Sequence, residues 1–229
     1  MAETVVDLPE AVGHPAFPST MEALVQRSGG SILDAARDIL DDHALVEECA
    51  VKRPRLLVPY VSASAPLSIA TGKNGAHPDD EPRVSAGLAC IVRGNRRALV
   101  RKNGLFQPFG YTLAVQWSNP YRGETTTWLG PAVVTAEDAE GTECRLQVSI
   151  DGELRYDEPI TDLHAAFVAT IPSTEERRPI APGDVVTWMR WSLAPDASPN
   201  GRIPTVVEVS SAPIGVLRAQ TPAWMRFGS

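Results

Sequence analysis

The stretch from Pro182 to Leu193 constrains the fold most, because its side chains alternate between two faces as they do in an extended strand. One face carries Val185, Thr187, Met189, Trp191 and Leu193, and the other carries Val186, Trp188, Arg190 and Ser192. Turn-forming residues flank the stretch at 182–184 and 195–204. The pattern predicts a half-buried β-strand with a tryptophan and an arginine side by side on its second face.

Further segments show the same strand pattern. Residues 111–117 alternate, and residues 144–150 alternate up to Asp151-Gly152, a dipeptide that predicts a tight hairpin back through residues 153–156. Apolar runs at 165–171, 206–209 and 214–217 predict more strands. The 20 prolines and 17 glycines are spread along the chain, as expected for many turns. We therefore expect a mainly β fold, an antiparallel β-sandwich or jelly-roll-like body, over residues 55–218.

The N-terminal quarter has helical rather than strand signals. Residues 1–18 contain Pro9, Pro15 and Pro18 and predict an extended arm. The capping box at 19–22 predicts a helix to about residue 28, and an amphipathic pattern predicts a second over 31–49. The expected organisation is an arm at 1–18, an acidic helical segment at 19–50, the β-body, and a tail at 219–229.

Charge and cysteine usage exclude several classes of protein. The net charge is −7, and residues 1–50 hold ten acidic residues against Arg27 and Arg37, which leaves the remainder close to neutral. No cluster of basic residues indicates nucleic-acid binding. Three cysteines without a CxxC pair do not form a disulfide scaffold. With no secretory signal and no apolar run of about 20 residues, we expect a protein without a membrane span, in the cytoplasm or in an assembled particle such as a virion.

The sequence shows no convincing metal or cofactor motif. The four histidines are too far apart in sequence for a shared ligand motif. The acidic run 77–81 could hold a hard cation, but it lacks EF-hand spacing. Neither a P-loop nor a dinucleotide-binding glycine pattern occurs. We therefore expect no metal and no cofactor.

One pair of residues suggests catalysis. Asp162 and His164 are two residues apart and could activate Ser149, Ser173 or Cys144 as a nucleophile. A hydrogen bond across a turn, without any catalytic role, is the stronger explanation of the pair. No Gly-x-Ser-x-Gly elbow is present. A hydrolase using Asp162 and His164 thus stays an alternative, and no residue is assigned a catalytic role.

Aromatic residues suggest a binding surface. Alternation sends Trp117 and Trp191 to core faces, whereas a second group is free to form a platform for a glycan or another small ligand: Trp188, Arg190, Trp128 and Tyr121. Packing inside the protein explains each member of this group as well. The sequence predicts them as ligand-binding residues.

The interpretation that the sequence favours is a non-enzymatic structural or assembly protein, such as a coat or accessory subunit of a particle. The near-neutral body and the two termini would support a homo-oligomer or a larger assembly. The expected oligomer contacts are in the tail, at Trp224, Met225 and Phe227. A glycan- or small-ligand-binding β-sandwich module is the main alternative.

Overall fold

The computed structural model describes residues 4–27, 30–52, 67–70, 82–93, 107–168, 180–194 and 203–226. The acidic run at 77–81 and Ser173, named above as a possible nucleophile, lie outside these ranges. Phe227 of the tail also lies outside them.

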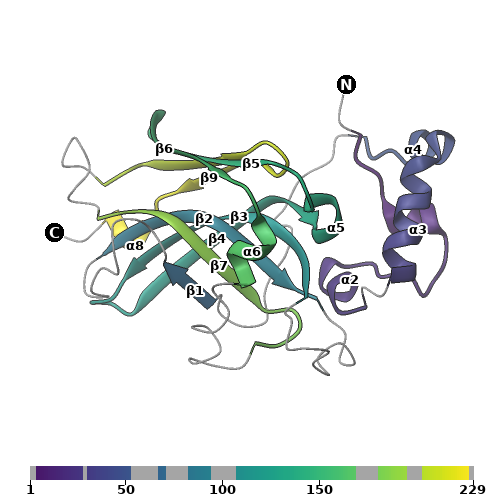
Figure 1. Cartoon of the computed structure of the whole chain (residues 1–229), viewed down its shortest axis with the longest axis horizontal. Coiled ribbons are helices and arrows are strands. Elements are labelled where there is room, and N and C mark those ends of the chain that lie inside the picture. Colours follow the sequence, from purple (N-terminus) through teal and green to yellow (C-terminus); the bar gives the residue numbers. More distant parts are fainter. Residues whose placement is uncertain are drawn as a thin grey trace.

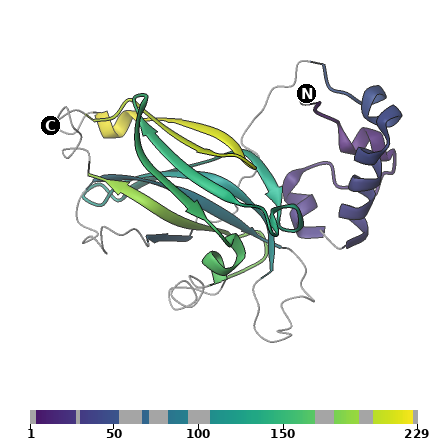
Figure 2. The ribbon, with the colours of Figure 1, turned by 45° about the horizontal axis from the view of Figure 1, so that its top comes forward.

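Two β-sheets form the body of the molecule (Figures 1 and 2). The five-stranded sheet has the order β1-β7-β2-β3-β4, and the four-stranded sheet has the order β6-β5-β8-β9. Their strands are β1 (Leu67–Ala70), β2 (Arg83–Val92), β3 (Pro108–Asn119), β4 (Glu124–Thr135), β5 (Cys144–Ile150), β6 (Glu153–Ile160), β7 (Val185–Leu193), β8 (Val206–Ser211) and β9 (Gly215–Gln220). All pairs are antiparallel except β1 with β7. The prediction of a mainly β fold is confirmed.

The hairpin between β5 and β6 follows the prediction from sequence. Asp151 and Gly152 have φ angles of 47° and 89°, so both turn residues adopt the positive φ that a tight two-residue turn requires. The Asp151 carboxylate also accepts hydrogen bonds from the backbone N–H groups of Thr205 and Val206, at 3.0 and 2.9 Å. The turn thereby holds the start of the neighbouring strand β8.

The main hydrophobic core fills the space between the two sheets. It takes alternate residues of β2, β3 and β7 from one sheet and of β5, β8 and β9 from the other. Its largest fully buried side chains include Trp117, Tyr111 and Phe167. Burying aromatic rings of this size contributes a large share of the hydrophobic stabilisation.

A β-bulge in β7 changes which side chains enter this core. Ala86 pairs with Trp191 while the next residue, Gly87, pairs with Met189, so Arg190 is the extra residue. Trp188 and Trp191 consequently both contact the core between the sheets, whereas Met189 packs on the opposite face. The sequence-based assignment of Met189 and Trp191 to one face is wrong, because strict alternation has no place for an inserted residue.

Short helices complete the fold: α1 (Leu8–Val12), α2 (Met21–Arg27), α3 (Gly30–Asp41), α4 (His43–Glu48), α5 (Ala136–Ala139), α6 (Leu163–Val168) and α8 (Ala223–Arg226). The expected helix over 31–49 is two helices, because the Asp42 side chain caps α4 by accepting from the N–H groups of Ala44 and Leu45. The expected extended arm contains α1. Among the described residues, no helix is long and apolar enough to cross a membrane.

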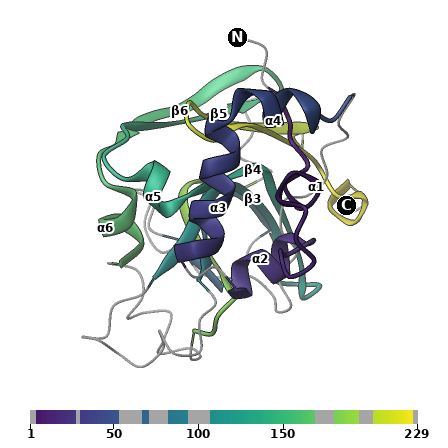
Figure 3. The same cartoon turned by 90° about the vertical axis from the view of Figure 1, so that its right-hand side faces the viewer.

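The N-terminal helices lie across one end of the sheets (Figure 3). Val25 of α2 and Leu33 of α3 are buried in a second cluster on the outer face of the five-stranded sheet, where they join Ala89, Ile91 and Met189. This contact explains the amphipathic pattern of α3. The division into arm, helical segment, body and tail stays a prediction.

Helix α6 replaces a strand that the apolar run 165–171 predicted. Asp162 precedes this helix, and its carboxylate accepts a hydrogen bond from the Ala165 N–H at 2.9 Å. The Phe167 ring then packs between Tyr111 and Trp188, with centroid distances of 5.4 and 5.9 Å. The strand prediction was wrong because a short apolar run fits a buried helix as well as a strand.

Gly87→Ala tests the close approach of β2 to the β7 bulge. A Cβ at position 87 would stand 2.2 Å from the Trp188 carbonyl oxygen, which is backbone and cannot move aside cheaply. We expect a loss of about 3 kcal/mol in the free energy of unfolding, from overpacking. Urea denaturation measures it. Gly123→Ala is the control, since no atom lies within 4 Å of its Cβ position and its φ of +63° is the main cost, about 1 kcal/mol. Equal losses in the two variants would contradict the prediction.

Candidate functional site

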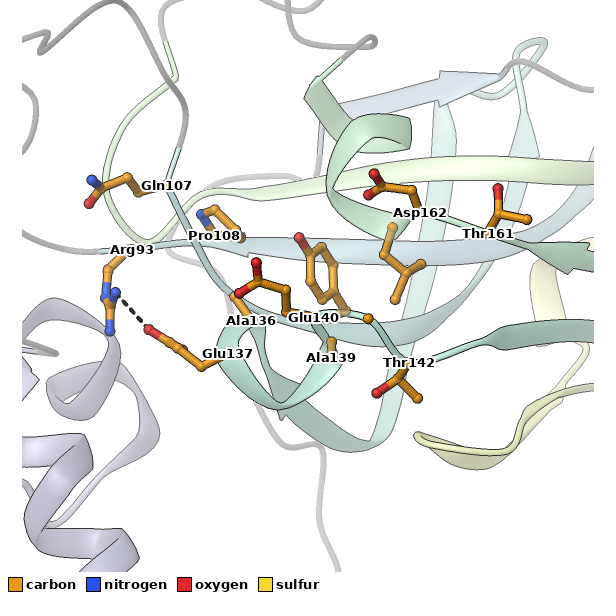
Figure 4. A pocket seen from close by; sticks show the side chains of 13 residues that line it. Arg93, Gln107, Pro108, Ala136, Glu137, Ala139, Glu140, Thr142, Thr161 and Asp162 are labelled. Carbon is orange, nitrogen blue, oxygen red and sulfur yellow. Dashed lines mark ion pairs between the residues drawn. The ribbon is translucent and has the colours of Figure 1, made fainter.

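A cavity of about 480 Å³ opens where β3 begins, between α5 and the start of α6 (Figure 4). This volume suits a small organic molecule. Its polar and charged lining comprises Arg93, Gln107, Tyr111, Glu137, Glu140, Thr142, Thr161 and Asp162. Figure 4 shows these side chains coming from segments that are distant in the sequence, so the cavity is a product of the tertiary fold.

Local hydrogen bonds hold the walls of the cavity. Thr135 caps α5, since its hydroxyl accepts from the Asp138 N–H at 3.3 Å. Thr142 closes the same turn by donating its hydroxyl to the Asp138 carbonyl oxygen at 3.1 Å. On the other side Asp162 caps α6. Hydrogen bonds between residues close together in the sequence therefore fix where these two short helices begin or end beside the cavity.

Tyr111 is the most deeply buried polar side chain in the lining. Its exposed fraction is 2%, and no hydrogen bond joins its hydroxyl to another residue in the described part of the chain. Burial raises the pKa of Tyr111, and nearby Cys90, Asp162 and Glu137 raise it further. The hydroxyl therefore stays protonated at neutral pH and is available to donate a hydrogen bond into the cavity.

The charges around the cavity are mainly negative. The Arg93 guanidinium forms an ion pair of 3.0 Å with the Glu137 carboxylate. Glu140 and Asp162 add two more carboxylates, and among the described residues no other charged side chain lines the cavity. Three carboxylates against one guanidinium give the lining a formal charge of −2. The cavity thus combines one protonated phenol with an excess of carboxylates.

The outer face of the five-stranded sheet carries a second polar region. Thr112 and Thr187 are fully buried there, and Ser85 is nearly so. The Ser85 and Ser192 hydroxyls are hydrogen-bonded at 3.1 Å, and Gln116 donates to Thr127 at 3.3 Å. The Thr112 hydroxyl donates to the Ala132 carbonyl oxygen at 2.7 Å. These groups bind one another, so they offer less unused hydrogen-bonding capacity than Tyr111.

Trp188 and Arg190, predicted as ligand-binding residues, lie within an internal network. Trp188 is 8% exposed, and the Arg190 guanidinium lies 4.8 Å from the centre of its ring. Arg190 also donates hydrogen bonds of 3.2 Å to the Tyr156 hydroxyl and to the Glu158 carboxylate, both on β6. The pair therefore links β7 of one sheet to β6 of the other.

Trp128 and Tyr121 lie apart from this pair. Trp128 is on β4, three strands from β7 in the sheet order, a separation of about 14 Å at the usual strand spacing. Tyr121 is in the turn between β3 and β4 and is 74% exposed. The structure does not bring the four residues together. Their role in ligand binding stays a prediction.

The tail residues dock on the body of the same chain. Met225 is 4% exposed and belongs to the main core. The Trp224 indole N–H donates to the Thr126 hydroxyl at 3.1 Å. Met225 and Trp224 therefore both have contacts within their own chain. Self-association through them stays a prediction.

The Asp162–His164 pair is only partly described. Asp162 is exposed and lines the cavity, but it also serves as the cap of α6. The side chain of His164 lies outside the described residues. Cys144 is buried, and burial raises the pKa of its thiol, which is also 2.8 Å from the Ser211 hydroxyl. A raised pKa leaves little thiolate at neutral pH.

Sequence reasoning missed Tyr111 as a functional residue. It stands in the alternating segment 111–117 among core residues, and its ring does belong to the core. The one available signal was its phenolic hydroxyl, which needs a polar partner when buried. Only the arrangement of β3 with α5 and α6 makes this residue part of a cavity wall.

The comparisons with known proteins identify the fold. Residues 106–188, a little over a third of the chain, match a family model described as fumarylacetoacetate (FAA) hydrolase C-terminal. No curated protein sequence matches the chain. A fumarylacetoacetate hydrolase from psychrophilic Exiguobacterium antarcticum superimposes with a TM-score of 0.68 at 19% identity, over 97% of this chain and 93% of that one.

Two further solved structures agree with this match. A maleylpyruvate hydrolase from Sphingobium sp. SYK-6, in complex with manganese(II) and pyruvate, has a TM-score of 0.59 at 16% identity, over 96% of this chain and 93% of that one. A putative HpcE protein from Mycobacterium smegmatis has a TM-score of 0.54 at 14% identity, over 96% and 94%. This chain therefore has a fold like that of fumarylacetoacetate hydrolase, rather than specifically a jelly roll.

These matches overturn the function predicted from sequence. The family model and two of the three neighbours are named for hydrolases, which points to an enzyme. The prediction of a non-enzymatic coat, capsid-like or assembly protein is wrong. Alternating strands, a proline-rich arm and an apolar tail are features of many β-proteins, so they did not distinguish an enzyme from a structural subunit.

The manganese bound in the maleylpyruvate hydrolase raises the question whether this chain could hold such an ion. Within the described ranges, no three His, Cys, Asp or Glu side chains are grouped so that they could bind a metal. Glu137, Glu140 and Asp162 surround the cavity without forming such a group. The polar outer face of the sheet supplies hydroxyls and an amide, which are poorer ligands than carboxylates. The described donor set does not fit a manganese site.

Arg190→Leu tests whether the Trp188 network is a structural link between the sheets. Leucine keeps apolar contact with Trp188 but removes the two hydrogen bonds that Arg190 donates to the Tyr156 and Glu158 side chains. We expect a loss of about 1 to 2 kcal/mol in the free energy of unfolding, measured by urea denaturation. Arg218→Leu, which removes a surface ion pair to Glu208, should cost less than about 0.5 kcal/mol. An unchanged stability for Arg190→Leu would contradict the structural role.

The buried Tyr111 and Cys90 predict a loss of stability at alkaline pH. Burial raises both pKa values above their usual 10.0 and 9.0. In the unfolded chain both groups lose protons at lower pH than in the folded one, so their contribution is complete below about pH 9 and declines as the pH rises further. The decline approaches about 1.4 kcal/mol per pH unit for each group.

Urea denaturation between pH 8 and 11 measures this decline. Tyr111→Phe should make the slope above about pH 10 shallower, whereas Tyr121→Phe, at an exposed position, should leave it unchanged. A slope that is identical in wild type and Tyr111→Phe would show that Tyr111 ionises as easily in the folded chain as in the unfolded one.

Proposed function

We propose that the protein is a hydrolytic enzyme that acts on a small carbonyl compound in the cavity between β3, α5 and α6. The observation that carries the proposal is the Tyr111 hydroxyl, which is buried, protonated and without a described hydrogen-bond partner at the wall of that cavity. The similarity to fumarylacetoacetate hydrolase over 97% of the chain supports the choice of reaction class.

The chemistry of such substrates requires a donor of this kind. The names fumarylacetoacetate and maleylpyruvate denote compounds in which an acyl group is bonded to the carbon next to a ketone. Hydrolysis adds the oxygen of water to the acyl carbon and breaks the carbon–carbon bond. The electron pair of that bond moves toward the ketone oxygen as an enolate, which then takes a proton on carbon. A hydrogen bond to the developing oxyanion lowers the barrier.

Tyr111 is suited to stabilise this oxyanion. Its raised pKa keeps the proton on the phenol, so the hydroxyl donates rather than accepts a hydrogen bond. Its ring is held by Phe167 at 5.4 Å, which limits reorientation during the reaction. The carboxylates of Glu137, Glu140 and Asp162 surround the same cavity and are available to take a proton from water or from the carbon next to the ketone.

Deuterium exchange and cleavage assays test this proposal together. Wild-type protein in D₂O is expected to exchange the hydrogens next to the carbonyl of a small ketone and to cleave a 1,3-diketone, both followed by ¹H NMR. Tyr111→Phe removes the donor and should lower both rates by about 10²- to 10³-fold. The matched control, Tyr121→Phe, changes the same atom at an exposed turn and should keep the wild-type rates.

The outcome that would refute the proposal is equally specific. If Tyr111→Phe folds normally by circular dichroism and keeps wild-type rates, the cavity is not the reaction site. If the wild-type protein neither exchanges nor cleaves any compound of a panel of neutral, anionic and cationic ketones, the proposed activity is wrong.

A further inference from the structure

The charge of the cavity points to the class of carbonyl compound that it accepts. Three carboxylates belong to the described residues of its lining, and of these only that of Glu137 pairs with a described arginine of the lining, at 3.0 Å. Glu140 and Asp162 both line the cavity, one directly after α5 and the other directly before α6. Within the described part of the chain, the Asp162 carboxylate accepts one hydrogen bond, from the neutral Ala165 N–H. Their two negative charges are therefore not balanced by the described residues of the lining.

A ligand whose carbonyl oxygen accepts from Tyr111 must place its remaining groups in this negative environment. A carboxylate on the ligand would be repelled by Glu140 and Asp162, whereas a protonated amine would be attracted. The whole chain, with a net charge of −7, adds repulsion of anions at long range. Because both carboxylates are exposed to solvent, salt should weaken this selection without abolishing it.

We propose that the cavity takes a carbonyl compound whose second polar group is cationic or uncharged, and that it discriminates against oxo acids. This inference rests on the proposed function, because it assumes that Tyr111 binds the carbonyl oxygen. It departs from pyruvate, the anionic ligand of the structurally similar maleylpyruvate hydrolase. The difference in ligand class accompanies the different donor set, since the described residues offer no group for the manganese ion of that enzyme.

A matched series of ligands tests the inference with the full-length protein. Aminoacetone, hydroxyacetone and acetoacetate share the CH₃–CO–CH₂ unit and differ in an ammonium, a hydroxyl or a carboxylate group. Their dissociation constants are measured by ligand-observed NMR at about pH 6.5, where the amine is protonated and carboxylates are ionised. We expect aminoacetone to bind about tenfold more tightly than acetoacetate, with hydroxyacetone between them.

Variants then test whether the carboxylates of the cavity cause this order of dissociation constants. The double variant Glu140→Gln and Asp162→Asn removes both negative charges and nearly keeps the shape of the two side chains. Asparagine can still cap α6. It should bring the three dissociation constants within about twofold of one another. Glu143→Gln removes an exposed carboxylate of the same loop that does not line the cavity, and it should preserve the wild-type order. Tyr111→Phe should weaken all three ligands by a similar factor, since each loses the same donor.

Each contrary result has a distinct meaning. If acetoacetate binds the wild-type protein as tightly as aminoacetone, the charge selection is wrong, while Tyr111-dependent exchange would still support the proposed function. If the double variant keeps the wild-type order, other charges cause it and the inference fails. If none of the three ligands binds the wild-type protein, the cavity is not the ligand site and the proposed function fails with the inference.

Discussion

The contact of Tyr111, Phe167 and Trp188 is the interaction on which the arrangement of this molecule depends. Tyr111 comes from β3, Phe167 from α6 and Trp188 from β7, and their rings are 5.4 and 5.9 Å apart. Such aromatic pairs add about 0.5 to 1.5 kcal/mol each beyond the burial of their area. The contact attaches α6 to the core, and it therefore sets the wall of the cavity that Asp162 and Leu163 form.

The same contact separates the apolar and polar parts of Tyr111. The ring is bound by core packing, and the hydroxyl is left at the cavity wall, where burial keeps it protonated. Rigid support of a polar atom by apolar packing is the usual way to hold a group ready for a ligand. A fold like that of fumarylacetoacetate hydrolase thus presents, in this chain, a phenol with surrounding carboxylates. The described donor set does not fit a divalent metal.

The bulge at Arg190 explains why the most informative strand was also the most misleading. Alternation over 182–193 correctly indicated a strand with an aromatic and an arginine together, and β7 covers most of that stretch. It placed Trp188 on a face that was free to bind a ligand, whereas the structure buries Trp188 and places Arg190 over its ring. One inserted residue reverses the facing of every later side chain, and neither glycine nor proline marks the position in β7.

By itself, the sequence determined the local structure of this protein. The hairpin at Asp151-Gly152, the helix cap at the start of α2 and the mainly β composition depend on residues close together in the chain. Only the tertiary structure decided the site. Arg93, Tyr111, Glu140 and Asp162 line one cavity because β3, α5 and α6 converge. Neither the closeness of their charges nor a Tyr111 hydroxyl without a described partner leaves a periodic signal in the sequence. Contacts between distant segments set solvent exposure and pKa, and these two properties distinguish a reactive side chain from a structural one.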